Sequence, residues 1–504
     1  MFIRKNKNRS GSYSIQIIEK VGRKNRVIKT LGSGRTTQEV GRLMNQAKLE
    51  LDLLRGQPSL FKNQRDDLIK NVLGLVSNAD ISIVGPSKIL GRLYDKIGYS
   101  SIEQSGYFRH LVISRLLFPG SKLKTVDYLF RFQQIQVSVD TLYKYMDKLQ
   151  SKHKTKIEQI TFNHTQKVLT GKISIVFYDM TTLYFEIDRE DDFRKRGFSK
   201  DGKHQHPQIK LGIIVAEEGY PIGYDIFEGS TFEGHTLIPV LEQVSKKFAI
   251  KKPIVVADAG LLSKKNIEAL DQAEYQYILG GKIKNESTQI KSKVLSKVIE
   301  QDKPILLKKG GQKIIVSYSA NRAAKDQHNR QRGLERLEKK LKTGKLTKAH
   351  VNNRGYNKYL KMDGQIDISI NYEKFKEDEK WDGLKSYVTN TALSRKEVIS
   401  AYSNLWHIEK AFRISKFDLR VRPIYHQVQR RIEAHICICF AAYAVYKELE
   451  RILKIKKVSF SAARAIQLCK TMYQIRIVLP DTMVEQKVLL RMTEEQKTLV
   501  NSIC

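Results

Sequence analysis

Four short, nearly continuous apolar segments constrain the fold of this chain most. They lie at residues 173–178, 208–215, 220–227 and 253–257. Strands with unbroken apolar sequences are those covered on both faces of a sheet, so the chain is expected to contain an α/β core. A helix at about 263–273 and a further strand at 275–279 follow the last segment, which predicts a local strand-helix-strand order.

Two regions precede this core. Residues 1–35 alternate polar and apolar positions around basic turns, which predicts a small β-hairpin unit, and a helix is expected at about 38–54. Between residues 83 and 160 the apolar positions follow a helical period. This helical region is either a helix-turn-helix-like DNA reader or a bundle with a solvated basic face. The two interpretations are equally favoured, because no recognition helix can be singled out.

The pattern becomes less regular after residue 281, with a strand at 313–318 and a strongly basic helix around 322–348. This stretch is interpreted as an insertion, because a strand at 384–390 and a further helix then resume the core. The expected division is a basic β-hairpin and helix unit at 1–75, a helical DNA-binding region at 76–165, the first part of the α/β core at 166–284, an insertion domain with the basic helix at 285–385, the rest of the core at 386–455 and a C-terminal helical segment at 456–504.

Three carboxylates stand out within the core. Asp179 and Asp258 each close an apolar strand segment, and Glu409 lies in a helix that should begin at the capping box formed by Ser394 and Glu397. Transfer of a DNA phosphodiester requires an activated attacking oxygen and a stabilised leaving oxygen, which two divalent cations about 3.5 to 4 Å apart supply. Carboxylate oxygens are the ligands that Mg²⁺ prefers. The three residues therefore suggest a metal-dependent phosphoryl-transfer site.

Each carboxylate also has a more ordinary interpretation. A lone aspartate at a strand end is often a turn or cap residue, and Glu409 with Arg413 is spaced as an exposed helical ion pair. On the predicted helix, Tyr402, Glu409 and Lys416 recur every seven residues. Residues at this spacing on one straight helix lie on one stripe, so these three side chains are expected to point the same way.

Charge supports a nucleic-acid partner. The chain has 90 Lys and Arg residues against 53 Asp and Glu, a formal net charge of +37 over 504 residues. Such an excess attracts polyanions, although charge alone does not separate DNA from ribosomal RNA or acidic lipid. The longest apolar run, at 436–446, is too short to span a bilayer and predicts a buried helix.

Cysteine usage and the N-terminus predict the compartment. Cys437 and Cys439 lie inside the longest apolar run and are expected to pack in a core, and four cysteines, Cys469 and Cys504 included, are too few for a disulfide framework. No apolar stretch of a secretory signal follows Met1. A cytoplasmic protein with no membrane partner is expected.

Taken together, these motifs resemble those of the DDE transposases of bacterial insertion sequences, in the group with a Tyr-x2-Arg-x3-Glu-x6-Lys signature. Tyr402, Glu409 and Lys416 match this spacing, and residues 178–186 and 256–260 resemble the two aspartate motifs of the group. The resemblance implies an RNase H-like core. It further implies that Asp179, Asp258 and Glu409 are catalytic and hold Mg²⁺ or Mn²⁺, with two ions per active site.

The resemblance also implies DNA contacts. Tyr402 and Lys416 would touch phosphates near the end of the element. The signature arginine falls at Leu405 in this chain, so its cation is either supplied by Lys410 or Arg413 or is absent.

The implied enzyme is a metal-dependent polynucleotidyl transferase, a transposase that binds terminal inverted repeats, cuts the element's end and joins it to target DNA. A homodimer in the synaptic complex and a nucleoid-associated location in the cytoplasm are expected by the same analogy. Two alternatives stay open, an RNase H-like DNA nuclease without strand transfer and a non-catalytic DNA-binding remnant. His204 and His206 have a His-x-His spacing but are expected in a flexible loop near the site.

Overall fold

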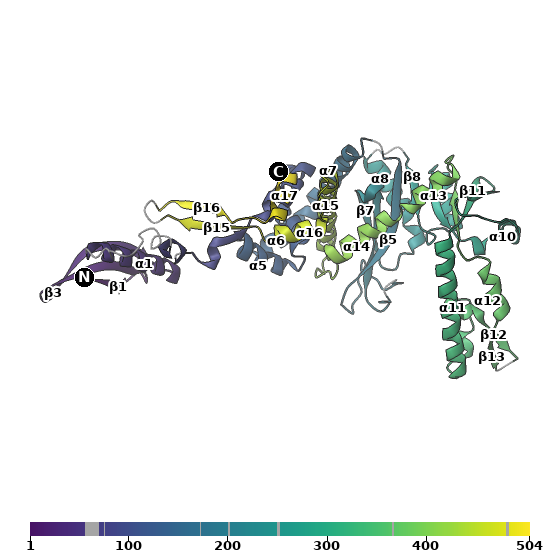
Figure 1. Ribbon diagram of the computed structural model, residues 1–504, viewed down its shortest axis with the longest axis horizontal. Coiled ribbons are helices and arrows are strands. Elements are labelled where there is room, and N and C mark those ends of the chain that lie inside the picture. The colour runs from purple at the N-terminus through teal and green to yellow at the C-terminus, as the bar shows by residue number, and fades with distance from the viewer. Residues whose placement is uncertain are drawn as a thin grey trace. The chain divides into compact units, whose positions relative to one another are not determined.

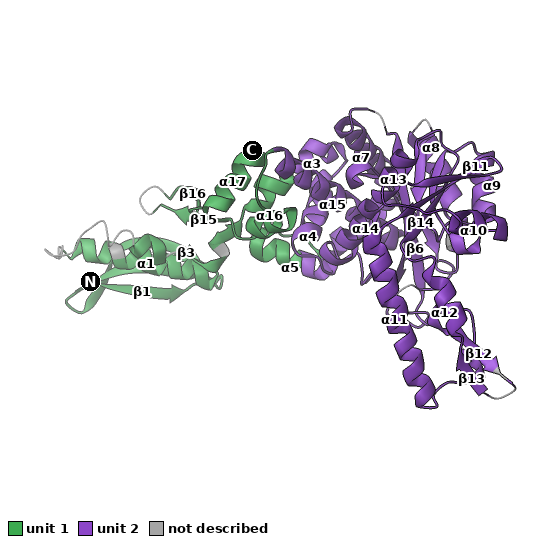
Figure 2. Cartoon of the chain, turned by 45° about the vertical axis from the view of Figure 1, so that its right-hand side comes forward, with its two compact units in different colours: residues 1–92, 126–138, 456–504 green, residues 93–125, 139–455 purple. Residues whose placement is uncertain are grey.

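A computed structural model describes residues 1–55, 70–74, 76–171, 173–199, 202–248, 252–364, 367–479 and 483–503 (Figure 1). Cys504 lies outside the described residues. The chain divides into two compact units (Figure 2). Unit 1 comprises Met1–Arg92, Val126–Ser138 and Lys456–Cys504, and unit 2 comprises Leu93–Thr125 and Val139–Ile455.

An eight-stranded mixed sheet organises unit 2, in the order β10-β11-β14-β9-β8-β5-β6-β7. The five strands that come first in the chain are β5 (Ile175–Tyr184), β6 (Gln208–Ala216), β7 (Pro221–Glu228), β8 (Ile254–Ala257) and β9 (Tyr277–Gly281). β5, β6 and β7 are antiparallel neighbours, whereas β5, β8 and β9 run parallel. An antiparallel meander joined through its first strand to two parallel strands is the RNase H-like arrangement, so the predicted fold class and the predicted strands are confirmed.

The apolar sequence of these strands follows from burial on both sides. All nine residues of β6 are buried. One face of the sheet packs against α7 (Lys154–Val168), α8 (Leu237–Phe248) and α9 (Lys264–Gln272), and this core includes Val176, Tyr178, Val255 and Ala257. The opposite face packs against α13 (Arg395–Ser403) and α14 (Trp406–Arg413), which contact β5, β6, β8, β9 and β14.

Three strands extend the sheet beyond β9. They are β10 (Ile305–Lys309), β11 (Gln312–Tyr318) and β14 (Leu384–Thr389), and all pair antiparallel. Between β11 and β14 the chain forms α11 (Ala320–Lys342), β12 (Leu360–Asp363), β13 (Asp367–Ile370) and α12 (Tyr372–Glu379). These elements share a small core of their own, made by Leu334, Leu337, Tyr359, Leu360 and Ile370. The predicted basic helix is α11.

A long helix, α15 (Gln429–Ile455), packs against α4 (Ser105–Leu117), α6 (Val139–Lys148) and α7 in unit 2. The predicted apolar run forms its middle, where Cys437 and Cys439 are buried free thiols, so the prediction of a buried helix is confirmed. Among the helices described, none is both long and apolar enough to cross a membrane.

Unit 1 contains the predicted hairpins. β1 (Phe2–Lys7), β2 (Tyr13–Val21) and β3 (Lys24–Gly34) form an antiparallel sheet, on which α1 (Thr37–Leu54) packs through a small apolar core. The C-terminal segment, expected to be helical, contains α16 (Ala462–Cys469) and α17 (Glu494–Ile503) but also a hairpin of β15 (Tyr473–Val478) and β16 (Glu485–Leu489). This hairpin pairs with β4 (Ile81–Ile83) at a distant point of the sequence, which the local pattern did not reveal.

Candidate active site

Asp179 and Asp258 occupy equivalent positions on two adjacent parallel strands. Tyr178 of β5 pairs with Ala257 of β8, and each aspartate is the next residue. Side chains alternate along a strand, so both aspartates lie on the sheet face opposite the one where Tyr178 and Ala257 join the core. Neighbouring strands are about 4.8 Å apart. The structure thus brings the two predicted aspartates side by side on one face.

α14 lies on this same face of the sheet. The ring of His407 is 6.3 Å from that of Phe177, measured between centroids, and Phe177 shares its strand face with Asp179. Ile408 and Ala411 are buried beneath the helix, whereas Glu409 is exposed. Packing of the apolar side of α14 therefore leaves the carboxylate of Glu409 on the solvent side of the helix.

The prediction of a single helix with one functional stripe is wrong. α13 begins at the predicted capping box, in which Glu397 N donates to Ser394 Oγ at 3.3 Å, but it ends at Ser403. A turn with a tighter, three-residue hydrogen bond follows, where Ile408 N donates to Leu405 O at 3.1 Å.

A second irregularity follows α14. Residues Ile414–Asp418 form a π-helix that contains Lys416. The turn after α13 and the π-helix after α14 each change the direction in which successive side chains point around the helix axis. Residues seven positions apart therefore no longer lie on one stripe. Tyr402 is accordingly buried while Glu409 is exposed.

Tyr402 lies against the sheet next to Asp258. A Cβ atom added at Gly280 would be 2.4 Å from the Tyr402 hydroxyl and 2.9 Å from the backbone nitrogen of Ala259. Leu279 of β9 pairs with Ala257 of β8. The next residues of the two parallel strands, Gly280 and Asp258, are therefore neighbours. The glycine is needed here because any side chain would occupy the place of the phenol.

The electrostatics of Tyr402 connect it with two of the predicted carboxylates. Burial raises the pKa of Tyr402 to about 12, and the negative charges of Asp258 and Glu409 act in the same direction. Its ring makes an edge contact with Tyr387 of β14 at 5.0 Å between centroids. Tyr402 is therefore a buried phenol close to both Asp258 and Glu409, and not an exposed member of a stripe.

Backbone donors hold both aspartates. Asp258 Oδ1 accepts a hydrogen bond from Gly260 N at 2.8 Å, and Asp179 Oδ1 accepts one from Met180 N at 2.7 Å. Both residues are half-buried. These bonds orient one oxygen of each carboxylate while the sheet fixes the backbone.

The cations predicted for DNA binding have different environments. Lys410 forms an ion pair with Glu450 of α15, and its Nζ lies 5.8 Å from the centroid of the Trp406 ring. Arg413 is exposed in the last turn of α14, and Lys416 is half-buried. Leu405, at the position of the signature arginine, is only 8% exposed and belongs to the apolar core.

Two cations near this site were missed by the sequence analysis, Lys385 of β14 and Arg322 of α11. Lys385 Nζ is 4.5 Å from the centroid of the Tyr402 ring. The charge of Arg322 lowers the pKa of both Lys385 and Tyr402, which places it in the same neighbourhood. No sequence signal marks them, because only the pairing of β14 with β9 brings this strand next to Asp258.

His204 and His206 lie in the connection between β5 and β6. His204 Nδ1 accepts a hydrogen bond from Ser199 N at 3.2 Å, and the ring of His206 is 6.0 Å from that of Tyr184 at the end of β5. These contacts are within the loop and with its adjoining strand.

The donor set suits a hard divalent cation. Asp179, Asp258 and Glu409 offer only carboxylate oxygens, the ligand type that Mg²⁺ and Mn²⁺ share. Within the part of the chain that the structure describes, no three Asp, Glu, His or Cys side chains are grouped closely enough to enclose one ion. The chemistry of the three residues fits such ions, and their present arrangement is not that of a single three-ligand centre.

Comparison with known proteins identifies the family. A family model for the transposase DDE domain matches residues 170–445, more than half of the chain. The chain belongs to this transposase family. The match begins just before β5 and ends within α15, so it includes the face that carries the three carboxylates. The prediction of a DDE transposase is confirmed, whereas the narrower group with the four-residue signature stays a prediction.

Several solved structures are similar to this transposase at low sequence identity. A piggyBac transposase synaptic complex with hairpin DNA is 10% identical over 76% of this chain and 76% of that chain, with a TM-score of 0.38. A Mos1 transposase paired-end complex with the left transposon end is 13% identical over 31% of this chain and 53% of that chain, with a TM-score of 0.16. A Mos1 mariner paired-end complex with Mn is 11% identical over 48% and 78% of the two chains, with a TM-score of 0.15. No curated protein matches the chain.

All three TM-scores are below 0.5, so the family model alone identifies the protein. Membership of the family implies an enzyme that cleaves and transfers DNA, and such enzymes normally use divalent metal ions.

Proposed function

We propose that this transposase belongs to an insertion sequence, binds the terminal inverted repeats of its element, and cuts and joins DNA strands at Asp179, Asp258 and Glu409. The observation that carries the proposal is the equivalent placement of the two aspartates on adjacent parallel strands, on the face where α14 packs. The electrostatic coupling of Tyr402 to Asp258 and Glu409 supports a common site.

The three carboxylates are proposed to hold two Mg²⁺ or Mn²⁺ ions. When bound, such ions activate the attacking oxygen and stabilise charge on the leaving oxygen. The fold of the protein fixes the positions of the three carboxylates. β5 and β8 fix the two aspartates, and the packed apolar side of α14 directs Glu409 outward. Preorganised charges of this kind need little rearrangement during the reaction.

The proposed reaction has two stages. Water attacks a phosphodiester at the element's end and releases a 3′ hydroxyl, and this hydroxyl then attacks a phosphodiester of the target DNA. The second stage exchanges one phosphodiester for another, so no nucleotide cofactor is required. Tyr402, Lys410, Arg413 and Lys416 are proposed to contribute to the DNA-binding surface, with Arg413 the most exposed of the four. A homodimer holding two ends, in the nucleoid of the cytoplasm, completes the proposal.

The test uses purified full-length protein with Mg²⁺ or Mn²⁺, DNA containing the gene's own flanks, and a supercoiled target plasmid. Wild type is expected to cut at the flanks and join the ends to the plasmid, and Asp179→Asn, Asp258→Asn and Glu409→Gln are expected to abolish both steps. Glu268→Gln is the matched control, since Glu268 is an exposed carboxylate on α9, on the opposite side of the sheet. It should retain full activity.

Each outcome separates the alternatives. Cutting without joining would indicate a nuclease on the same core. DNA binding by folded wild type without any cutting would indicate a non-catalytic protein. Activity that survives all three substitutions would refute the assignment of the catalytic residues.

A further inference from the structure

Lys385 is a cation that lies beside two aromatic rings of the proposed site, those of Tyr387 and Tyr402. It lies on β14 two residues before Tyr387, so the two side chains share a face of the strand. Its Nζ is 4.5 Å from the ring centroid of Tyr402 and 5.5 Å from that of Tyr387, within the range of cation–π attraction. Partial burial lowers the pKa of Lys385, the charge of Arg322 lowers it further, and that of Glu409 raises it. Lys385 is thus electrostatically coupled to a proposed catalytic carboxylate.

Arg322 adds a second cation from the first turn of α11. It is exposed, and its charge acts on Lys385, Tyr387 and Tyr402. Its Nε lies 3.5 Å from Oδ2 of Asp326, one helical turn later.

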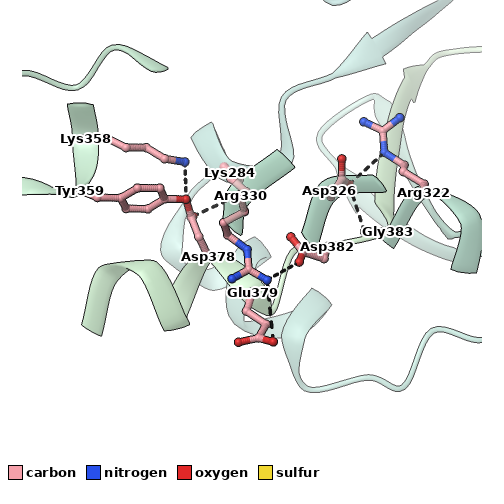
Figure 3. Close-up of polar contacts among 10 residues, drawn as sticks. All are labelled: Lys284, Arg322, Asp326, Arg330, Lys358, Tyr359, Asp378, Glu379, Asp382 and Gly383. Atoms are coloured by element: carbon pink, nitrogen blue, oxygen red, sulfur yellow. Dashed lines mark hydrogen bonds and ion pairs between the residues drawn. The ribbon is translucent and has the colours of Figure 1, made fainter. Parts of the chain in front are cut away.

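Asp326 also connects α11 with the start of β14. The same Oδ2 accepts a hydrogen bond from Gly383 N at 3.2 Å (Figure 3). In addition, Ser319 N donates to Gly383 O at 3.0 Å. Gly383 adopts φ +81° and a Cβ there would be 2.6 Å from the Tyr318 ring, so a glycine is required for this close approach. The strand that carries Lys385 and the helix that carries Arg322 are therefore fastened together two residues before Lys385.

The position of the signature arginine supplies no cation here, and the exposed Arg413 of α14 lies one turn after Glu409. Leu405 is buried and apolar, and Lys410 is engaged by Glu450. A DNA phosphate that approaches Asp258 and Glu409 is repelled by both carboxylates, so a nearby positive charge lowers the free energy of the bound strand.

We propose that Lys385 and Arg322 bind a backbone phosphate of the DNA strand beside the catalytic carboxylates, and that Asp326 is a positioning residue for Arg322. The inference rests on the proposed function, since DNA is the ligand. Arg322 and Lys385, both within the predicted insertion, then supply the positive charge that the signature arginine would have supplied at the position of Leu405. Contacts of this kind fix the strand in place and carry no sequence information.

The test compares Lys385→Met and Arg322→Gln with Lys252→Met. Methionine preserves the apolar stem of Lys385 against the two tyrosines. Lys252 precedes β8, six residues before Asp258, which is about 20 Å along an extended strand, so its removal subtracts the same charge at the other end of β8. Arg322 is exposed, so its variant is expected to fold even where a change at Lys385 impairs folding.

Two readouts are needed. The first is binding of end DNA without divalent metal across a salt series, where loss of one phosphate contact lowers the slope of log affinity against log salt by about 1. The second is the cleavage rate at saturating DNA with Mg²⁺. Lys385→Met and Arg322→Gln are each expected to show the reduced slope and about 10-fold to 100-fold slower cleavage. Lys252→Met is expected to match wild type in both.

Asp326→Asn tests the positioning role. Asparagine retains an oxygen that can accept from Gly383 N but loses the charge that attracts Arg322, so the variant is expected to slow cleavage in the wild-type background and to add nothing to Arg322→Gln. An additional effect in the Arg322→Gln background would overturn this part of the inference.

Wild-type slopes and rates in folded Lys385→Met and Arg322→Gln would overturn the inference while leaving the proposed function intact. Absence of metal-dependent cleavage by wild type would instead refute the proposed function, so the two failures are distinguishable.

Discussion

Two groups of carboxylates in unit 2 are held in opposite ways. Glu448 of α15 has a fully buried side chain, with Lys96 at 3.1 Å, Arg451 at 2.6 Å and His164 at 3.2 Å. Burial alone would raise its pKa, but hydrogen bonds from Arg451 and His164 prevail and lower it to about 2. Asp258 is half-buried and Glu409 is exposed, and the charges of both act on the nearby Tyr402.

The difference separates carboxylates whose charge the protein neutralises itself from carboxylates whose charge we propose is neutralised by bound metal ions. The Glu448 cluster joins α15 to α7 and to α3 (Arg92–Ile97), and it acts in folding. The carboxylates of the site are oriented by backbone donors and strand register. Substitutions in the two groups should therefore separate activity from stability.

The largest effect is expected from Asp258→Asn. It should reduce strand cleavage by at least about 10³-fold, roughly 4 kcal/mol of activation free energy, because a proposed metal ligand is lost. The free energy of unfolding should change by less than about 0.5 kcal/mol, since asparagine retains the oxygen that accepts from Gly260 N. Single-turnover cleavage and urea unfolding measure the two quantities. A large loss of stability would mean that this aspartate is structural.

Glu448→Gln should show the reverse pattern. Removing the buried negative charge leaves Arg451 and Lys96, whose side chains are 23% and 51% exposed, without this partner, which is expected to destabilise the protein by about 3 kcal/mol. Cleavage per folded molecule should be unchanged, because α7 covers the face of the sheet opposite the two aspartates.

The same variant gives a pH test. A carboxyl pKa lowered from 4.5 to about 2 contributes stability that is fully present above pH 4.5 and is lost as the pH falls towards 2. The difference in unfolding free energy between wild type and Glu448→Gln should therefore shrink over that interval. A constant difference would contradict the assigned charge state.

Asp378→Asn tests an intermediate case inside the insertion. Asp378 pairs with Lys284 at 2.9 Å and with Lys358, and accepts a hydrogen bond from the Tyr359 hydroxyl at 2.7 Å (Figure 3). Although burial raises it, these bonds lower the pKa of Asp378 to about 2. The substitution is expected to cost roughly 1 to 2 kcal/mol, given partial solvent screening. Hydrogen exchange should show the loss in α12, with α15 unaffected.

The smallest effect is expected at an exposed pair. Lys264 and Glu268 on α9 are 3.6 Å apart, with side chains 92% and 54% exposed. Removing either charge should change the unfolding free energy by less than about 0.5 kcal/mol. Thermal or urea unfolding of Glu268→Gln checks this, and a loss comparable to that of Glu448→Gln would remove the distinction between the two groups.

Much of the core was predictable because its signals are local. Near-continuous apolar segments become β5 to β8, since helices cover both faces of the sheet. Asp258 directly follows its strand as predicted, whereas Asp179, which was expected to close its strand, lies in the middle of β5, because the strand continues to Tyr184. The capping box at Ser394 correctly predicted where α13 begins. These features depend only on residues within a few positions of one another.

What the sequence did not predict depends on contacts between distant segments. The break between α13 and α14 puts Tyr402 and Glu409 on different helices, although their spacing is that of a regular helix. Lys385 reaches the site because Tyr387 pairs with Gly280, more than a hundred residues earlier. Which strands pair depends on the packing of the whole sheet, so the sequence of neither strand alone predicts this pairing.

The placement of Trp406 has a practical consequence. The protein has two tryptophans, and Trp406 is 48% exposed at the first residue of α14, three positions before Glu409. The other, Trp381, packs against the core just before β14. Indole emission responds to the displacement of neighbouring water, and a Trp381→Phe protein carries a single tryptophan, three residues before the proposed catalytic glutamate. Binding of DNA, and of the proposed metal ions, can then be followed by tryptophan emission, without a label and without turnover.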